Sequence, residues 1–223
     1  MNILIIGGSK GLGKQLGANL ESGTNNVVCL SRSSDIPLDL EWNTDYISEL
    51  ARKVVQDRLG GALDVLILAS GMGAYFAPTV SGAAVEKMFK VNVLGPLAVF
   101  RGCQKFLLAS KGKACMITST CSRRPGSGGL SIYGATKGAI NSWVVNESRR
   151  QSKKGVAVFA VSPGFFNSEM TEEIKPRLKE AITKAIPFKR FGEVGEIAEF
   201  VESLLYQSNW CLSGQIYECS GGQ

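Results

Sequence analysis

The sequence predicts a doubly wound α/β fold, in which a parallel β-sheet carries helices on both faces. Short runs of β-branched and aliphatic residues alternate along the chain with longer segments typical of helices. These runs are apolar throughout, as expected of parallel strands that are covered on both sides. The 223 residues fit one domain, and no linker, repeat or low-complexity segment divides them. We therefore expect a single domain over residues 1–223.

Six strands and six helices are expected, in alternating order. The strand candidates are Asn2–Ile6, Asn26–Leu30, Val65–Leu68, Ala114–Thr118, Val156–Val161 and Ile216–Cys219. The helix candidates are Gly11–Glu21, Thr44–Leu59, Ala83–Leu108, Ser131–Gln151, Glu172–Ala185 and Val194–Tyr206.

One crossover is unusually short. Only the seven residues Ser31–Pro37 separate the second strand from Leu38–Leu40, which resembles a short third strand. A parallel crossover that contains a helix normally needs about ten residues or more. We therefore expect the helix between these strands to be missing, and the third strand to be a stub or absent.

The composition excludes several classes of protein. Hydrophobic residues make up 44% and charged residues 20%, which excludes a mainly disordered chain. Glycine is in excess, at 26 residues, which indicates loops that need positive φ or a close approach to a ligand. The net charge is +6, but the basic residues occur as scattered pairs without interleaved aromatics, so nucleic-acid binding is not expected.

Histidine is absent, which excludes every mechanism that needs a histidine base. The six cysteines form no C-x-x-C pair, so no metal site is expected. No secretion signal is expected, and the cysteines are interpreted as reduced thiols of a cytoplasmic protein. The uncharged stretch Val65–Val85 is long enough to cross a membrane, but Gly71, Gly73 and Pro78 divide it into a strand and a loop. No membrane span is expected.

The first strand runs directly into Gly7-Gly8-Ser9-Lys10-Gly11-Leu12-Gly13, which an apolar helix follows. Glycines at 7, 11 and 13 allow a tight turn whose backbone N–H groups can approach a pyrophosphate at a helix N-terminus. The alternative is a glycine-rich turn without a ligand. The position of the glycine motif directly after an N-terminal strand favours a nucleotide site, although its spacing, G-x-x-x-G-x-G, differs from the commoner G-x-G-x-x-G.

Tyr133 and Lys137 are four residues apart on a predicted helix, so both lie on one face. An ammonium near a phenol favours the phenolate and lowers a pKa that is otherwise about 10. Such a tyrosine can exchange a proton with an alcohol or ketone near neutral pH. Alone, the pair is also a common feature of helix surfaces.

Together, the glycine turn and Tyr133-x-x-x-Lys137 resemble the short-chain dehydrogenase/reductase family, which has a Rossmann-like fold. The resemblance covers essentially the whole chain and extends to the β-ketoacyl carrier-protein reductases and related ketoreductases. Further motifs support it: Asn92 in Val91–Gly95, Ser162-Pro163-Gly164 with Asn167-Ser168, Phe188–Gly192 before Glu196-Ile197-Ala198, Ser213-Gly214-Gln215, and Gly221-Gly222. Leu68-Ala69-Ser70-Gly71 departs from the family's N-N-A-G, and Ile6 replaces a threonine before the first glycine.

The resemblance implies four catalytic residues. Tyr133 would be the general acid, and Lys137 would hold the nicotinamide ribose and lower the tyrosine pKa. Thr120 lies thirteen positions before Tyr133, where the family has a serine hydroxyl, with Ser119 and Ser122 as alternatives. Asn92 would join a water-linked proton relay to the lysine.

Asn92 also has an interpretation independent of the family. Pro96 lies four residues later in the expected helix and cannot donate to the carbonyl of Asn92. The helix should kink there and leave that carbonyl free for water or a lysine. The alternative is an ordinary proline kink without a catalytic role.

The resemblance implies NADPH as the cofactor. Lys10 and Arg32 are placed to meet a 2′-phosphate, and Ser31 stands near the position of the acidic residue of NAD enzymes. Asp35 is a competing acidic residue beyond Arg32. The other implied cofactor contacts, beside Tyr133 and Lys137, are Gly7, Ser9, Gly11, Leu12, Gly13, Asp39, Leu40, Gly71, Pro163, Gly164, Phe166 and Ser168.

We therefore expect an NADPH-dependent carbonyl reductase that acts on a small-molecule carbonyl or alcohol. The alternatives are an NAD-dependent alcohol or sugar dehydrogenase and a catalytically idle nucleotide-binding scaffold or sensor. The segment Met170–Pro187 resembles the family's mobile lid. Four aromatic residues on loops should either border the substrate or pack the lid: Tyr75, Phe76, Phe165 and Phe166. The small residues of Ser131–Gln151, which is the family's main dimer helix, indicate a homo-oligomer, either a dimer or a tetramer.

Overall fold

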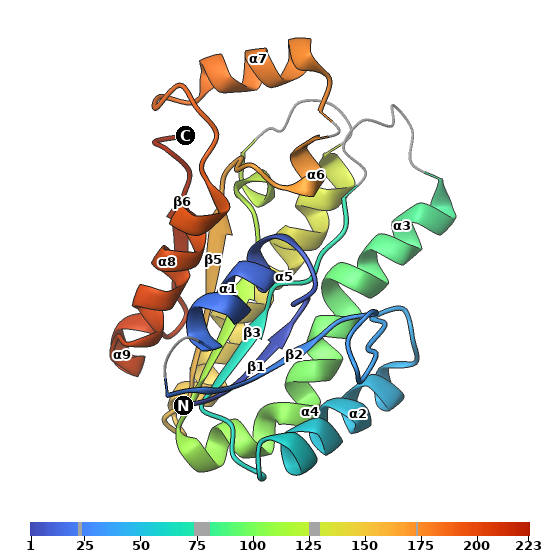
Figure 1. The fold of residues 1–223 in the computed structure, drawn as a ribbon, viewed down its shortest axis with the longest axis vertical. Helices are drawn as coiled ribbons and strands as arrows, with labels where there is room; N and C mark the ends of the chain where they lie inside the picture. Colours follow the sequence, from blue (N-terminus) through green and yellow to red (C-terminus); the bar gives the residue numbers. More distant parts are fainter. Residues whose placement is uncertain (22–23, 74–80, 125–129, 173) are drawn as a thin grey trace.

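The computed structural model contains one sheet of six parallel strands in the order β2-β1-β3-β4-β5-β6 (Figure 1). The structure describes residues 1–21, 24–73, 81–124, 130–172 and 174–223. The strands are β1 (Asn2–Ile6), β2 (Asn26–Leu30), β3 (Val65–Leu68), β4 (Lys113–Ile117), β5 (Ala157–Pro163) and β6 (Ile216–Cys219). Every predicted strand is therefore present, within two residues of its expected bounds.

The α-helices of the described residues lie mostly on the two faces of this sheet. They are α1 (Gly11–Glu21), α2 (Thr44–Arg58), α3 (Gly82–Phe89), α4 (Gly95–Ser110), α5 (Ser131–Ser152), α6 (Glu169–Glu172), α7 (Pro176–Ala185), α8 (Val194–Leu205) and α9 (Asn209–Leu212). The doubly wound α/β fold is thus confirmed.

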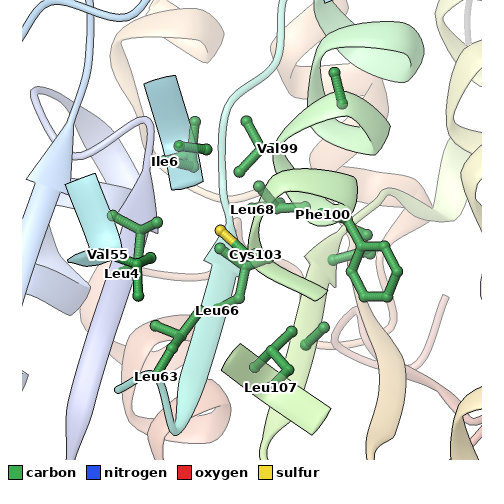
Figure 2. Close-up of a cluster of buried hydrophobic side chains, with 14 of the residues drawn as sticks. Leu4, Ile6, Val55, Leu63, Leu66, Leu68, Val99, Phe100, Cys103 and Leu107 are labelled. Atoms are coloured by element: carbon green, nitrogen blue, oxygen red, sulfur yellow. The ribbon is translucent and has the colours of Figure 1, made fainter. Parts of the chain in front are cut away.

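Alternate residues of each strand enter different cores, as the period of two along a strand requires. Leu4 and Ile6 of β1 pack with α2, α4 and α5, whereas Ile3 and Ile5 pack with α1 and α8. Figure 2 shows the first core, in which Leu66 and Leu68 of β3 lie against the side chains of α4. Apolar residues on both strand faces are therefore buried, which explains the unbroken apolar runs of the sequence.

The short crossover after β2 contains neither a helix nor a strand until α2 begins at Thr44. Leu38 and Leu40 are buried without joining the sheet, and Leu40 fills the space that a side chain at Gly95 would need. The expected helix is missing and the third strand is absent. β2 is consequently one of the two edge strands of the sheet, and β6 is the other.

The expected helix Ala83–Leu108 is interrupted. Its two parts, α3 and α4, are joined by a π-helical turn at Lys90–Leu94, and Pro96 occupies the second position of α4. A π turn contains an extra residue and accommodates a missing backbone donor, so the predicted kink takes this form. Asn92 lies inside the turn and is 1% exposed.

The predicted lid is also divided, because Pro176 starts a new helix, α7. Ile182 and Ile186 pack there with Ile174 and Phe191 in a small core separate from the sheet. Figure 1 shows α6 and α7 beyond one end of the strands. In the described part of the chain, no helix has the length and apolarity needed to cross a membrane.

Candidate active site

The sheet end nearest α6 borders a cleft with a volume of about 560 Å³. All the predicted site residues line this cleft except Gly13 and Asn92. Those that line it are Gly7, Ser9, Lys10, Gly11, Leu12, Arg32, Asp39, Leu40, Gly71, Thr120, Tyr133, Lys137, Pro163, Gly164, Phe166 and Ser168. Residues predicted from separate motifs along the chain thus meet in one place.

The glycine turn forms the floor of the cleft at the start of α1. Gly7 and Gly11 have φ values of +94° and +50°, which L side chains rarely adopt. A Cβ on Gly7 would approach the backbone nitrogen of Ser70 to 2.7 Å, whereas a Cβ on Gly11 would meet nothing within 4 Å. The turn is therefore shaped to keep backbone N–H groups and open space beside the N-terminus of α1. This arrangement fits a pyrophosphate.

Gly13 packs against the glycine turn from within α1. It is buried in α1 and does not line the cleft. A Cβ at this position would overlap the carbonyl oxygen of Gly7. Gly13 therefore allows α1 to start directly against the turn, whereas its contact with a cofactor stays a prediction.

Tyr133 and Lys137 lie on α5, and both side chains are buried. The Lys137 Nζ lies 5.7 Å from the centre of the Tyr133 ring and donates a hydrogen bond of 2.9 Å to the carbonyl of Ile117, where β4 ends. Burial lowers the pKa of Lys137 from 10.5 to about 8. α5 thus brings a phenol and a readily titrated ammonium to the same wall of the cleft.

Two of the three candidate hydroxyls for orienting a carbonyl line the cleft. The short 3₁₀ helix Thr120–Ser122 follows β4, and Thr120 and Ser119 both line the cleft. The Ser122 hydroxyl instead donates to the carbonyl of Ser119 at 2.7 Å and accepts from Asn141 Nδ2 at 2.7 Å. Ser122 is therefore a structural residue of the turn, and Thr120 and Ser119 remain the candidates.

The Asn92 side chain makes three hydrogen bonds behind the cleft wall. Its Oδ1 accepts from the backbone N–H of Met72 at 2.8 Å, and its Nδ2 donates to the Met72 carbonyl at 2.8 Å and to Thr136 Oγ1 at 3.0 Å. A Cβ on Gly71 would lie 3.2 Å from Lys137 Nζ and 3.6 Å from Asn92 Oδ1. Asn92 therefore fixes the segment next to the lysine, whereas the relay through its main-chain carbonyl stays a prediction.

The opposite end of the cleft is lined by Ser31, Arg32 and Ser33, which follow β2. Asp35 is exposed and does not line the cleft. The ammonium of Lys10 is also at the cleft, but it is paired there with Glu169 of α6.

Sequence reasoning missed a second ion pair that lines the cleft. Lys87 Nζ lies 2.8 Å from Glu41 Oε1. The two residues are forty-six positions apart and belong to no common motif, so no local pattern could have revealed the pair.

The predicted aromatic residues divide into two sets. Tyr75 and Phe76 lie outside the described residues. Phe165 and Phe166 line the cleft, and Phe165 also packs on Phe191 of the lid core, with ring centres 5.5 Å apart. Phe165 therefore serves both predicted purposes, as a wall of the cleft and as packing for the lid.

Comparisons with known proteins place similar sequences and structures over most of the chain. A family model described as enoyl-(acyl carrier protein) reductase matches residues 24–223. The acetoacetyl-CoA reductase of Synechocystis sp. is 29% identical over 215 residues, which cover 91% of this chain and 87% of that enzyme. The short-chain dehydrogenase fogD of Aspergillus ruber is 36% identical over 109 residues, which are 48% of this chain and 37% of that protein. The solved structure of ElxO with NADP bound has a TM-score of 0.86 at 23% identity, over 99% of this chain and 97% of that one.

Proposed function

The chain belongs to the short-chain dehydrogenase/reductase family and is an oxidoreductase of that class, and we propose that it is an NADPH-dependent carbonyl reductase. The observation that carries the proposal is the meeting of Tyr133, Lys137 and the Thr120 hydroxyl in a cleft that begins at the glycine turn. These residues supply a proton donor, a cation and a group that orients a carbonyl, next to a glycine turn that fits a pyrophosphate.

A nicotinamide cofactor held at the glycine turn and by Lys137 would supply a hydride to the carbonyl carbon, whose π electron pair moves to the oxygen. Thr120 orients the carbonyl, because its hydroxyl can donate a hydrogen bond to the substrate oxygen. Tyr133 gives its phenolic proton to that oxygen, so the product is an alcohol. The Lys137 ammonium, 5.7 Å from the phenol ring, favours the phenolate that remains and can also hold the ribose.

NADPH is favoured over NADH by the residues at the β2 end of the cleft. Arg32 is exposed there and forms no ion pair among the described residues, so its guanidinium is available to a phosphate. No carboxylate of the Ser31–Ser33 segment stands where it would repel one. The names of the relatives, which include a reductase and an NADP-bound structure, point in the same direction.

The substrate, oligomeric state and location are also proposals. Phe165 and Phe166 suit a small carbonyl compound with an apolar part next to the reacting carbon. Exposed Ala135, Ser142 and Val145 on α5 offer a face for a second copy, which sedimentation at micromolar concentration would detect as a dimer or tetramer. All six cysteines are unpaired, which supports a cytoplasmic location that cell fractionation can check.

The function is tested by following oxidation of NADPH and of NADH with a panel of ketones, β-ketoacyl thioesters included. Tyr133→Phe keeps the ring and its packing but removes the proton donor, so turnover should fall by about 10²–10⁴-fold while NADPH binding is kept. Tyr46→Phe is the matched control, because Tyr46 is 56% exposed on α2. A Tyr133→Phe enzyme that binds NADPH and reduces ketones at the wild-type rate would contradict the proposal.

A further inference from the structure

Asn141 is a buried polar residue in the middle of α5, where asparagine has no helical advantage. It follows Tyr133 by eight residues and Lys137 by four, so it continues the same side of the helix toward the turn after β4. Its side chain is only 6% exposed. Its Nδ2 donates to Ser122, whereas its Oδ1 is buried and has no hydrogen-bond partner among the described residues. Such an unsatisfied acceptor destabilises a fold, so packing alone does not account for this residue.

The partner of Asn141 is the hydroxyl of Ser122, the last residue of the turn that begins at Thr120. Ser122 Oγ passes the hydrogen bond on to the carbonyl of Ser119 at 2.7 Å, and the backbone N–H of Ser122 donates to the same carbonyl at 3.0 Å. The N–H groups of Arg123 and Arg124 both donate to the Thr120 carbonyl at 3.0 Å. The Asn141 amide is therefore the first donor in a series of two hydrogen bonds that ends at the carbonyl of Ser119, the residue before Thr120.

The turn also lies directly against α5. A Cβ on Gly134 would overlap the carbonyl oxygen of Cys121, so the helix backbone and the turn approach as closely as glycine allows. The Cys121 side chain of the turn also packs beside Tyr133. Packing of this kind has no preferred direction, whereas the hydrogen bond from Asn141 to Ser122 is directional and fixes the turn relative to the helix.

We propose that Asn141 is a positioning residue, whose amide holds the Thr120–Ser122 turn through the Ser122 hydroxyl and so sets the Thr120 hydroxyl relative to Tyr133. The proposal rests on the proposed function, since it assigns Thr120 its place in carbonyl reduction. Asn141 touches neither the cleft nor the reacting atoms. It acts through the turn alone.

The test compares Asn141→Leu, Ser122→Ala and the double variant with Asn146→Leu as the matched control. Asn146 is exposed on the same helix, and its amide donates to the Ser142 carbonyl within α5. Leucine has the same number of side-chain heavy atoms and the same branching at Cγ as asparagine, and it removes the unsatisfied acceptor together with the donor. The first readout is kinetic and consists of kcat, KM and NADPH affinity. The second is the alkylation rate of Cys121, which mass spectrometry resolves from the rates of the other cysteines.

Cys121 reports the order of the turn without any reaction being catalysed. It lines the cleft and is partly buried, and burial raises the pKa of its thiol, so it reacts slowly while the turn is held. Cys103 and Cys115 are fully buried in the sheet cores and report global unfolding.

In Asn141→Leu, we expect kcat to fall about 10- to 100-fold with NADPH affinity kept, because a small displacement of an orienting group is enough for such a loss. Cys121 should be alkylated several-fold faster, Cys103 and Cys115 should stay protected, and the melting temperature should be unchanged or higher. Ser122→Ala should give the same loss of kcat. The double variant should be no worse than either single variant, because both changes interrupt the same series of hydrogen bonds. If Asn141→Leu does not fold, Ser122→Ala carries the test.

Wild-type kcat together with a wild-type Cys121 rate in Asn141→Leu or in Ser122→Ala would overturn the proposal. A loss of kcat with an unchanged Cys121 rate would also overturn it, since the turn would then be held by something else. If the wild-type protein reduces no ketone, the proposed function fails. The Cys121 rate then still decides whether Asn141 orders the turn.

Discussion

Lys10 and Glu169 form an ion pair of 2.7 Å that joins the glycine turn to α6 across the cleft. The two residues are 159 positions apart, and both line the cleft. Their side chains are 74% and 57% exposed, so the pair adds little to the stability of the fold. The pair bears on binding, because the Lys10 ammonium that we propose for a cofactor phosphate is already paired with a carboxylate at the cleft.

Removal of the Glu169 charge should therefore favour NADPH. In Glu169→Gln, the Lys10 ammonium loses its competing partner and the cleft loses a negative charge. We expect NADPH affinity to rise by about two- to fivefold, in line with the strength of exposed pairs, and NADH affinity to change less. Fluorescence titration of both cofactors measures this. Glu172→Gln is the control, since Glu172 is on the same helix but does not line the cleft. Unchanged or weaker NADPH binding would remove Lys10 from the phosphate site.

Arg32 should decide between the two cofactors. Arg32→Ala removes a charge-assisted contact worth about 1.5–3 kcal/mol, so the NADPH/NADH ratio of kcat/KM should fall by about 10- to 100-fold. Asp35→Ala, on the same loop but away from the cleft, should leave the ratio as it is. Steady-state kinetics with both cofactors is the measurement, and an Arg32→Ala enzyme with the wild-type ratio would rule out the assignment.

The buried ammonium of Lys137 should make stability depend on pH. Its pKa is about 8 in the folded protein, against 10.5 for an ordinary lysine, so between these values the unfolded chain binds more protons than the folded one. Stability from this group therefore rises with pH across that window, by about 3 kcal/mol in total, and below pH 8 the cost of burying the charge is fully present.

Urea unfolding of the wild type and Lys137→Met at a series of pH values measures this contribution. The free energy of unfolding of the wild type minus that of the variant should increase from pH 8 to pH 10. The buried thiols act in the opposite sense, because burial raises the pKa of Cys103 and of Cys219 to about 12, but they do so in both proteins and cancel in the difference. A difference that does not vary with pH would mean that Lys137 keeps an ordinary pKa.

Gly13 should prove to be a packing residue. Gly13→Ala places a methyl group against the carbonyl of Gly7, which belongs to the backbone and cannot move cheaply, so we expect a loss of about 1–3 kcal/mol in the free energy of unfolding. Gly195→Ala, in α8 with no atom within 4 Å of the new methyl group, should instead gain up to about 1 kcal/mol. Denaturant unfolding compares the two. Equal effects would show that the close contact at Gly13 is relieved.

The sequence by itself determined the strands, most of the helices and many of the residues that line the cleft. Strands buried on both faces need unbroken apolar runs, and a turn with positive φ needs glycine at Gly7 and Gly11, so each leaves a local pattern. The pair Tyr133 and Lys137 was predictable for the same reason, since the helical repeat alone puts four-residue neighbours on one face.

Only the tertiary structure decided which residues meet across the chain. Three contacts join segments that are 20, 19 and 159 positions apart. They are the hydrogen bonds of Asn92 to Met72, the hydrogen bond of Asn141 to Ser122 and the ion pair of Lys10 with Glu169. A hydrogen bond depends on where two segments are brought in space, and sheet order and helix packing fix that position. The residue types at these sites could be read in advance, but their partners could not.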